Sequence, residues 1–294
     1  MLHLKLRGEQ HMQMNSNNLL LKIGSSINDL RPSEQKIAQY VVHNYQDVIY
    51  QTVSELASNS GVSEASVMRF VKTLGFKGFQ YFKLSLANIP DNNDGAMQSL
   101  LQDDSAFSVK TNIRNNIITS INDTATVLED DSLNKAVNFI LKAKQIFLVG
   151  VGSSGIIARL LSYKLIRIGI ISKYISDSHL QTMHSSLLDK RSLLIGISHS
   201  GSTIDTVDAL RIAYEGGAKT ICITDHIKSP IVKYSNVLLC TYAREDPLGV
   251  SQGTSSASQI YVIETLLACL YNNVKEHANL ARKKTAESVL KKMY

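Results

Sequence analysis

From residue 145 onward, short apolar runs alternate with helical stretches, and this alternation restricts the possible folds more than any other feature of the chain. We expect five strands, at residues 146–149, 170–175, 192–197, 219–224 and 237–241. Most of their residues are apolar, as in strands that helices cover on both faces. The alternation therefore predicts an α/β domain with a doubly wound parallel sheet.

The first and third of these strands each end in a loop rich in glycine and serine, and a helix is expected after each loop. The loops are Gly150-Val-Gly-Ser-Ser-Gly155 and Ser198-His-Ser-Gly-Ser-Thr203. Backbone N–H groups and the helix dipole favour an anion at a helix N-terminus, and hydroxyl groups add further donors. Ligands of doubly wound sheets bind at the carboxyl ends of the strands, so both loops are expected to hold one phosphate group.

The first loop also has the Gly-x-Gly-x-x-Gly spacing of dinucleotide-binding sites, through Gly150, Gly152 and Gly155. A dinucleotide site needs an acidic residue at the end of the second strand to bind the ribose. Lys173 stands near that point, and Asp177 comes later. A nucleotide site is therefore the weaker alternative, and the second, hydroxyl-rich loop favours a phosphate monoester.

Residues 19–87 have helical periodicity and few strand signals, which predicts an all-α N-terminal domain. Residues 52–59 are expected to form one short helix and residues 63–74 another, each beginning at a threonine or serine cap. Gly61 supplies a permissive backbone in the turn between them. Two short helices joined in this way are typical of a helix-turn-helix unit, although a plain helical hairpin has the same pattern.

If the second helix of this pair enters the major groove of DNA, residues near its start face the bases. The outward-facing candidates there are Ser63, Glu64, Ala65 and Ser66. Arg69 is the best candidate for a bidentate contact with guanine. Lys72 and Lys77 are better placed to contact phosphates, and a local excess of basic residues between 63 and 83 agrees with DNA binding.

These segments resemble the helix-turn-helix of the RpiR family of sugar-phosphate-responsive regulators. The resemblance covers about residues 19–90 and includes Thr52-Val-Ser-Glu-Leu-Ala, Gly61-Val-Ser-Glu-Ala-Ser-Val-Met-Arg-Phe70 and Leu74-Gly-Phe-Lys-Gly-Phe79. It implies that a double-stranded DNA operator is one partner of the chain and that a phosphorylated sugar is its effector.

Residues from about 130 to 290 resemble the SIS (sugar isomerase) domain of phosphosugar isomerases and RpiR-family regulators, on both loops and on Lys164–Gly169, Gly217–Thr224 and Ser229-Pro230. The resemblance implies that the phosphate is held by Ser153, Ser154, Ser198, Ser200 and Thr203. Further candidate ligand-binding residues are Gly152, His199, Gly201 and Gln259. Gln259 stands where the family often has arginine, so the sugar differs here if that arginine takes part in recognition.

Composition bears on metal and cofactor sites, on nucleic-acid binding and on the location of the protein in the cell. The three cysteines, Cys222, Cys240 and Cys269, are sparse and lack metal-ligand spacing, so we expect buried thiols, no metal and no cofactor. The formal net charge of +6 permits binding to nucleic acid. No apolar run reaches the ~18 residues needed to span a bilayer. Residues 1–13 lack the apolar core of a signal peptide, so we expect a cytoplasmic protein whose first dozen residues are a disordered extension.

A chain of 294 residues is long enough for two domains. We expect a helix-turn-helix domain at 15–91, a linker and connecting helix at 92–128, and a SIS domain at 129–294, with a turn-rich cluster at 90–95 near the first boundary. The expected function is a non-enzymatic, DNA-binding transcriptional regulator that a phosphorylated sugar controls and that acts as a homodimer or higher homo-oligomer.

Two alternatives remain open. The first is a phosphosugar isomerase with an appended helical domain, for which Glu264 is the candidate general base. The second is a sugar-phosphate sensor whose helical domain binds protein instead of DNA. A hydrolase triad is rejected, because Ser200, His199 and Asp205 lie too close together in sequence to form its geometry.

Overall fold

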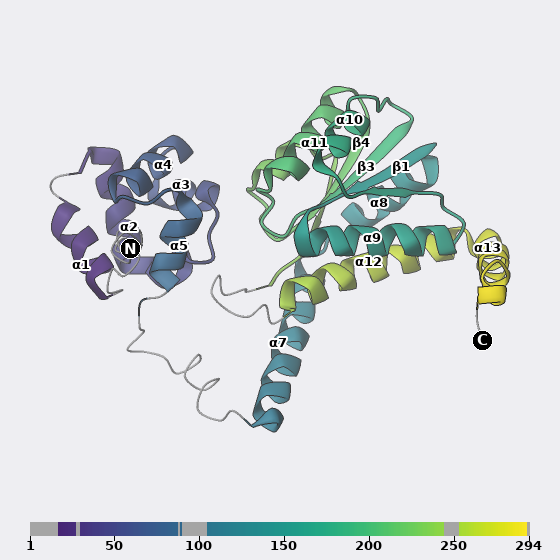
Figure 1. Cartoon of the computed structure of the whole chain (residues 1–294), viewed down its shortest axis with the longest axis horizontal. Coiled ribbons are helices and arrows are strands. Elements are labelled where there is room, and N and C mark those ends of the chain that lie inside the picture. The colour runs from purple at the N-terminus through teal and green to yellow at the C-terminus, as the bar shows by residue number, and fades with distance from the viewer. Residues whose placement is uncertain (1–16, 28–29, 88, 90–104, 244–252, 293–294) are drawn as a thin grey trace, which may run out of the picture. The chain divides into compact units, whose positions relative to one another are not determined.

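The computed structural model describes residues 17–27, 30–87, 89, 105–243 and 253–292 (Figure 1). Within these residues the chain divides into two compact units, the first running to Lys110 and the second starting at Thr111. The expectations about the first dozen residues and about the turn-rich cluster at 90–95 concern residues outside the described part. The domain boundaries at 91 and 128 stay predictions.

The first unit consists of helices, as the sequence predicts. They are α1 (Asn17–Ser26), α2 (Pro32–Val48), α3 (Val53–Ser60), α4 (Glu64–Thr73) and α5 (Phe79–Ala87). Their apolar faces meet in one core, in which Phe70 and Phe82 are fully buried with ring centroids 5.9 Å apart. Pro32 occupies the first turn of α2, where its fixed φ suits the helix.

Local hydrogen bonds define the ends of α3 and α4. The Oγ1 atom of Thr52 accepts a hydrogen bond from the Glu55 N–H at 3.2 Å, and the Glu55 carboxylate accepts one from the Thr52 N–H at 2.8 Å. Gly61 ends α3 in the left-handed region, with φ 66°. Ser63 then caps α4 by accepting a hydrogen bond from the Ser66 N–H at 3.3 Å. The predicted pair of short helices with a glycine in the turn is therefore confirmed.

The second unit contains a five-stranded sheet in which every pairing of neighbouring strands is parallel. The strands are β1 (Gln145–Val149), β2 (Lys173–Ile175), β3 (Ser192–Ile197), β4 (Lys219–Thr224) and β5 (Val237–Cys240). Their order is β2-β1-β3-β4-β5, which confirms the predicted doubly wound parallel sheet. The second strand is shorter than predicted, because its first three expected residues lie outside the ladder with β1.

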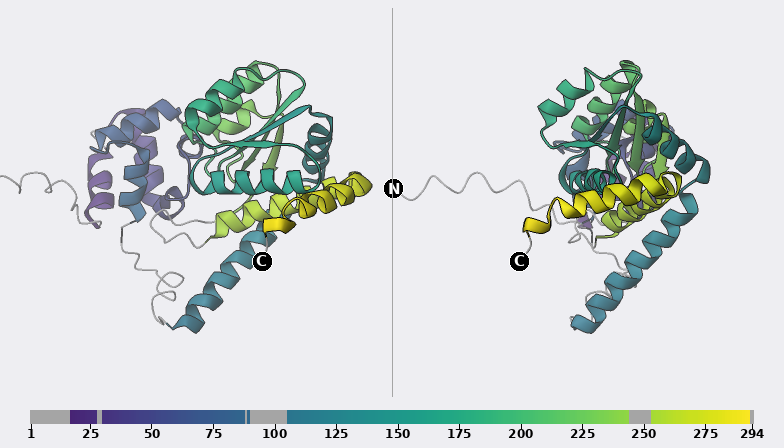
Figure 2. Two further views of the ribbon diagram at one scale, coloured as in Figure 1. Left: turned by 45° about the vertical axis from the view of Figure 1, so that its right-hand side comes forward. Right: turned by 90° about the vertical axis from the view of Figure 1, so that its right-hand side faces the viewer.

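Helices cover both faces of this sheet, as Figure 2 shows. One face packs against α8 (Asp130–Lys142), α9 (Gly152–Arg167) and α12 (Thr254–Asn273) in the larger core. The other face packs against α11 (Ile204–Glu215), which in turn contacts α10 (Ser178–Ser185). Alternate strand residues therefore enter different cores: Leu193 and Ile195 face the first, and Leu194 faces the second.

The order of the strands creates a switch point between β1 and β3. Helix α9 follows β1 onto one face of the sheet, and α11 follows β3 onto the other. At such a point the two connections diverge and leave a crevice at the carboxyl ends of the strands. The fold thus brings the two glycine- and serine-rich loops to the place where doubly wound proteins bind ligands.

Four further elements complete the described chain. They are α7 (Ala106–Val127), which precedes α8, α13 (Lys275–Glu287), which follows α12, and two short 3-10 helices at Pro230–Tyr234 and Leu290–Lys292. Among the described helices, none is both long enough and apolar enough to cross a lipid bilayer.

Candidate functional site

The two glycine- and serine-rich loops lie next to each other. Strand β1 pairs with β3 along its whole length, so that Val149 stands opposite Gly196 and both loops start at the same edge of the sheet. The Oγ atom of Ser154, in the first loop, accepts a hydrogen bond from the N–H of His199, in the second, at 3.3 Å. One small anion can therefore reach donors from both loops.

Hydroxyl groups hold the second loop in shape. The Oγ atom of Ser198 lies 3.2 Å from the Oγ1 atom of Thr203, and the Ser200 hydroxyl accepts a hydrogen bond from the Ser202 N–H at 3.3 Å. Ser198 is buried, whereas Ser200 and Thr203 are half-buried. Because neither loop contains lysine or arginine, hydroxyl groups, backbone N–H groups and helix dipoles would have to stabilise a bound anion.

Helix α9 begins within the first loop, at Gly152, and α11 begins directly after the second loop. Neither helix has a side-chain cap on its N-terminus. The first turn of α9 contains no acidic residue, and its first three residues, Gly152, Ser153 and Ser154, provide N–H groups for an anion. The first turn of α11 contains the exposed carboxylate of Asp205. The N-terminus of α9 therefore has the more favourable electrostatics for an anion.

Two glycines in the loops are required by close packing. Gly201 has φ 60°, and a Cβ atom there would overlap the Oγ atom of Ser229 and lie 2.8 Å from the Oγ1 atom of Thr224. A Cβ atom on Gly155 would lie 2.6 Å from the hydroxyl oxygen of Tyr174. The third glycine of the Gly-x-Gly-x-x-Gly spacing thus allows α9 to pack tightly against the end of β2.

Gln259, in α12, contacts the first loop. Its Nε2 atom donates a hydrogen bond to the Oγ atom of Ser154 at 3.4 Å, and the residue is only 2% exposed. The candidate ligand-binding residues from the sequence therefore come from three segments that meet at one edge of the sheet. Gly152 and Ser153 are the exposed members of this group.

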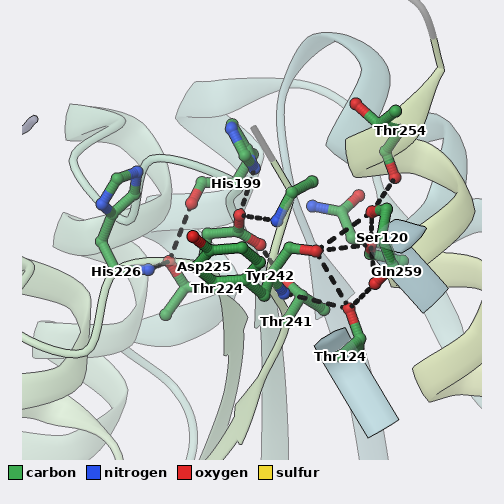
Figure 3. A network of polar contacts seen from close by, with 12 residues as sticks. Ser120, Thr124, His199, Thr224, Asp225, His226, Thr241, Tyr242, Thr254 and Gln259 are labelled. Carbon is green, nitrogen blue, oxygen red and sulfur yellow. Dashed lines mark hydrogen bonds and ion pairs between the residues drawn. The ribbon is translucent and has the colours of Figure 1, made fainter. Parts of the chain in front are cut away.

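A carboxylate that the sequence analysis did not select lies beside the second loop. Asp225 directly follows β4, and its side chain is 6% exposed. One of its oxygens lies 3.7 Å from the Nδ1 atom of His199 and accepts a hydrogen bond from the Ala243 N–H at 2.6 Å, while the other accepts one from the Thr241 hydroxyl (Figure 3). The sequence could have indicated this residue, because Asp225 directly follows a buried strand and so lies at the same edge of the sheet as both loops.

The main chain of His199 is held as well. Its carbonyl oxygen accepts hydrogen bonds from the Thr224 hydroxyl at 3.0 Å and from the Asp225 N–H at 3.1 Å. The imidazole rings of His199 and His226 lie edge to face, with centroids 5.8 Å apart (Figure 3). The end of β4 thus sets the position of the second loop.

In the first unit, most candidate DNA-binding residues are exposed: Ser63, Glu64, Ala65, Arg69, Lys72 and Lys77. The expectation that Ser66 faces outward is wrong, because this residue is only 5% exposed. Its hydroxyl lies 3.0 Å from the Ser63 Oγ atom and accepts a hydrogen bond from Arg69 at 3.1 Å. Ser66 therefore supports the start of α4 and the side chain of Arg69 instead of facing solvent.

Lys83 is a half-buried cation in the same unit. Its Nζ atom donates a hydrogen bond to the carbonyl oxygen of Gln51 at 2.9 Å, next to the start of α3. Burial lowers its pKa from 10.5 to about 8, an effect that the nearby negative charge of Glu55 partly opposes. Lys83 thus ties α5 to the segment that caps α3.

Two of the cysteines belong to the sheet. Burial is the main cause that raises the pKa of Cys222 to about 12 and that of Cys240 to about 11, so both thiols are protonated at neutral pH. Within the described part of the chain, no three histidine, cysteine or acidic side chains are grouped so that they could hold a metal ion.

Two families of known domains match this chain. The SIS domain matches residues 139–269, and the helix-turn-helix domain of the rpiR family matches residues 17–91. A helix-turn-helix type transcriptional regulator of Haemophilus influenzae is 33% identical over 281 residues, which cover 94% of this chain and 97% of that protein. The transcriptional regulator RpiR of Escherichia coli K12 is 27% identical over 258 residues, which cover 87% of each chain.

The fold is also similar to a solved structure over nearly its whole length. The NanR protein of Vibrio vulnificus, in complex with ManNAc-6P, superposes on this chain with a TM-score of 0.83. The two sequences are 29% identical, and the match covers 94% of this chain and 100% of that one.

Proposed function

This chain belongs to the rpiR family of helix-turn-helix transcriptional regulators, and we propose that a phosphorylated sugar bound in its SIS domain controls its binding to operator DNA. The observation that carries this proposal is the hydrogen bond between Ser154 and His199. It joins the two glycine- and serine-rich loops at the switch point of the sheet. The similarity to NanR, which was solved with ManNAc-6P, supports a sugar phosphate as the effector.

We assign the phosphate to the two loops. Its oxygens would accept hydrogen bonds from the backbone and hydroxyl groups of Gly152, Ser153, Ser154, Ser198, His199, Ser200, Gly201 and Thr203. Gln259, buried beside Ser154, would face the sugar and contribute to the choice of effector. If the arginine that the family often has at this position takes part in sugar recognition, the amide of Gln259 would favour a different sugar.

A thermal-shift screen tests the effector site. The compounds are inorganic phosphate, glucose 6-phosphate, glucosamine 6-phosphate, ManNAc-6P and a disaccharide phosphate. At about one hundred times its Kd, a true effector stabilises the second unit by about 2.7 kcal/mol. Ser200→Ala should weaken this effect, whereas Ser186→Ala, which removes an exposed hydroxyl at the end of α10, should not. Equal shifts in both variants would contradict the assignment.

DNA binding is tested by fluorescence anisotropy with the DNA upstream of the gene and with a scrambled duplex. Arg69→Ala should weaken binding to the specific DNA by about 1–3 kcal/mol and reduce discrimination between the two duplexes. Lys72→Ala should weaken binding to both and reduce the slope of affinity against salt by about one. Lys36→Ala, an exposed lysine on α2, is the control. A wild-type protein that fails to bind either duplex would favour the sensor with a protein-binding domain.

We further propose that the protein is a cytoplasmic homodimer or higher homo-oligomer. Helix-turn-helix proteins read paired half-sites, and a two-fold symmetric assembly presents two recognition helices to them. Sedimentation velocity with and without operator DNA tests the assembly: the complex should contain an even number of chains, and a single chain on the duplex would contradict it.

We propose no enzymatic activity, because Glu264 is poorly placed to act as the base of an isomerase. Its carboxylate forms an ion pair of 2.5 Å with Lys164, near the end of α9, whereas the phosphate loops meet at the start of that helix. The ten residues from Ser154 to Lys164 correspond to about 15 Å along a helix. Interconversion of aldose and ketose phosphates above the uncatalysed rate, and its loss in Glu264→Gln, would instead establish the isomerase.

A further inference from the structure

Two buried hydroxyl groups of helix α7 contact the rest of the second unit. This helix has 22 residues, and its buried residues are Ser120, which is 5% exposed, and Thr124, which is fully buried. Several of its large apolar residues, such as Phe107 and Ile118, are exposed. Figure 2 shows most of α7 extending away from the sheet and its helices. Directional hydrogen bonds therefore contribute to the contact between α7 and the rest of the unit, beside half-buried isoleucines of the same helix.

These bonds converge on the peptide groups of one residue, Tyr242, which follows β5. The Thr124 hydroxyl accepts a hydrogen bond from the Tyr242 N–H at 3.0 Å and lies 3.1 Å from the Tyr242 carbonyl oxygen. That oxygen also lies 3.0 Å from the Oγ atom of Ser120 and 3.0 Å from the Oγ atom of Ser258, so either hydroxyl can donate to it (Figure 3). Any shift of Tyr242 along the chain direction would break several of these bonds at once.

The residues on either side of Tyr242 bind the carboxylate of Asp225. Thr241 does so through its hydroxyl, and Ala243 through its N–H at 2.6 Å. Asp225 in turn donates its own N–H to the carbonyl oxygen of His199 at 3.1 Å. A continuous set of hydrogen bonds therefore joins the second loop of the candidate site to α7.

A second route joins α7 to the first loop. The hydroxyls of Ser120 and Ser258 lie 2.5 Å apart, in the buried contact between α7 and α12. The next residue of α12, Gln259, donates a hydrogen bond to the Oγ atom of Ser154. Both loops that would hold a phosphate are thus connected to the same turn of α7.

We infer that Ser120 and Thr124 are positioning residues that couple the two phosphate loops to α7, so that occupancy of the loops changes the stability of this helix. The inference rests on the proposed function for the identity of the ligand, but the coupling itself is a property of the hydrogen-bonded network. In the sequence, α7 lies between the helix-turn-helix unit and the strands of the sheet. A change in the stability of α7 would therefore act on the segment that connects the two units. Coupling of this kind is reciprocal: what stabilises α7 also favours the ligand-binding form of the loops.

The first test uses hydrogen–deuterium exchange on the full chain without any sugar phosphate. Thr124→Val keeps the shape of the side chain but removes the hydroxyl that binds Tyr242. We expect exchange of the amides in 198–203 to become about 10-fold faster, because the loop loses its link to α7. Thr126→Val, whose hydroxyl bonds only within α7 to the carbonyl oxygen of Asn122, is the matched control and should leave exchange in 198–203 unchanged.

Unchanged exchange of residues 198–203 in Thr124→Val would overturn the inference, since the network would then transmit nothing to the loop. If this variant fails to fold by circular dichroism, Ser120→Ala replaces it, with Ser108→Ala near the exposed start of α7 as its control. The expected result for Ser120→Ala is the same faster exchange in 198–203.

The second test adds inorganic phosphate at saturating concentration to the wild-type chain. Phosphate should slow exchange in 198–203 and also in residues 111–120 of α7, with α8 as an internal control that does not change. In Thr124→Val, the protection of residues 111–120 should be lost while the protection of the loops remains. Protection of the loops without any effect on α7 in the wild type would refute the coupling. Absence of protection in the loops themselves would refute the proposed phosphate site and leave the first test to decide the coupling.

Discussion

Gly201 is the residue whose replacement most directly tests the geometry of the second loop. A Cβ atom at this position would overlap Ser229 and would require a left-handed backbone. Gly201→Ala should therefore lower the free energy of unfolding of the second unit by about 1–3 kcal/mol and abolish phosphate protection of the loop.

Gly217→Ala is the matched control for this substitution. Gly217 also has a positive φ, of 86°, but no atom lies within 4 Å of the position of its Cβ. Gly217→Ala should therefore lower the free energy of unfolding by the cost of backbone strain alone, about 1 kcal/mol. Urea unfolding followed by circular dichroism compares the two, and equal losses would show that the contact with Ser229 does not matter.

Lys83 makes the stability of the first unit depend on pH. Its pKa is about 8 in the folded chain and 10.5 in the unfolded chain, so between these values the unfolded state holds a proton that the folded state has released. The free energy of unfolding should therefore rise as the pH increases from 8 to 10.5. In Lys83→Met this rise should be absent, whereas Lys36→Met, at an exposed position, should retain it. Urea unfolding across this range measures the difference, and identical pH profiles would contradict the effect of burial.

At the scale of elements, the capping box of α3 controls the first helix of the helix-turn-helix. Thr52→Ala removes the hydroxyl that accepts the Glu55 N–H and should lower the free energy of unfolding of the first unit by about 1 kcal/mol. Thr52→Ser retains an equivalent hydroxyl and should retain most of the stability. Differential scanning calorimetry measures both variants, and an equal loss in the two would show that the methyl group, not the cap, is responsible.

The elements that sequence patterns predicted least well are the short ones. Strand β2 pairs with β1 over only Lys173–Ile175, and helix α10 has just two turns between β2 and β3. Periodicity needs a longer window to distinguish helix from strand, and both elements depend on packing against neighbours for their limits. The helix expected after the second loop, by contrast, is present as α11, because it is longer and glycines follow its end.

At the scale of the whole molecule, each unit has its own hydrophobic core. We therefore expect two unfolding transitions. Phe82→Ala, in the first unit, should destabilise one of them by about 3–5 kcal/mol and leave the other unchanged. Leu161→Ala, in the larger core of the second unit, should have the opposite selectivity, and an effector should raise only the transition that Leu161→Ala lowers. A single transition that responds to both variants would contradict independent cores.

The amino-acid sequence alone was sufficient for features that arise from neighbours along the chain. Buried strands, the caps of α3 and α4, and two hydroxyl-rich loops before helices all depend on residues within a few positions of one another. The parallel order of the strands then placed both loops at one edge. For these reasons the α/β fold, the helix-turn-helix and most of the candidate phosphate site could be predicted.

Contacts between distant segments required the folded chain. Ser154 and His199 are 45 positions apart, and Ser120 and Tyr242 are 122 apart. Hydrophobic periodicity also did not indicate that Ser66 is buried. Nor did it indicate that Asp225 lies between His199 and the residues after β5. Such contacts join hydroxyls and carboxylates to main-chain groups, and hydrophobic periodicity carries no information about which of these polar partners will meet.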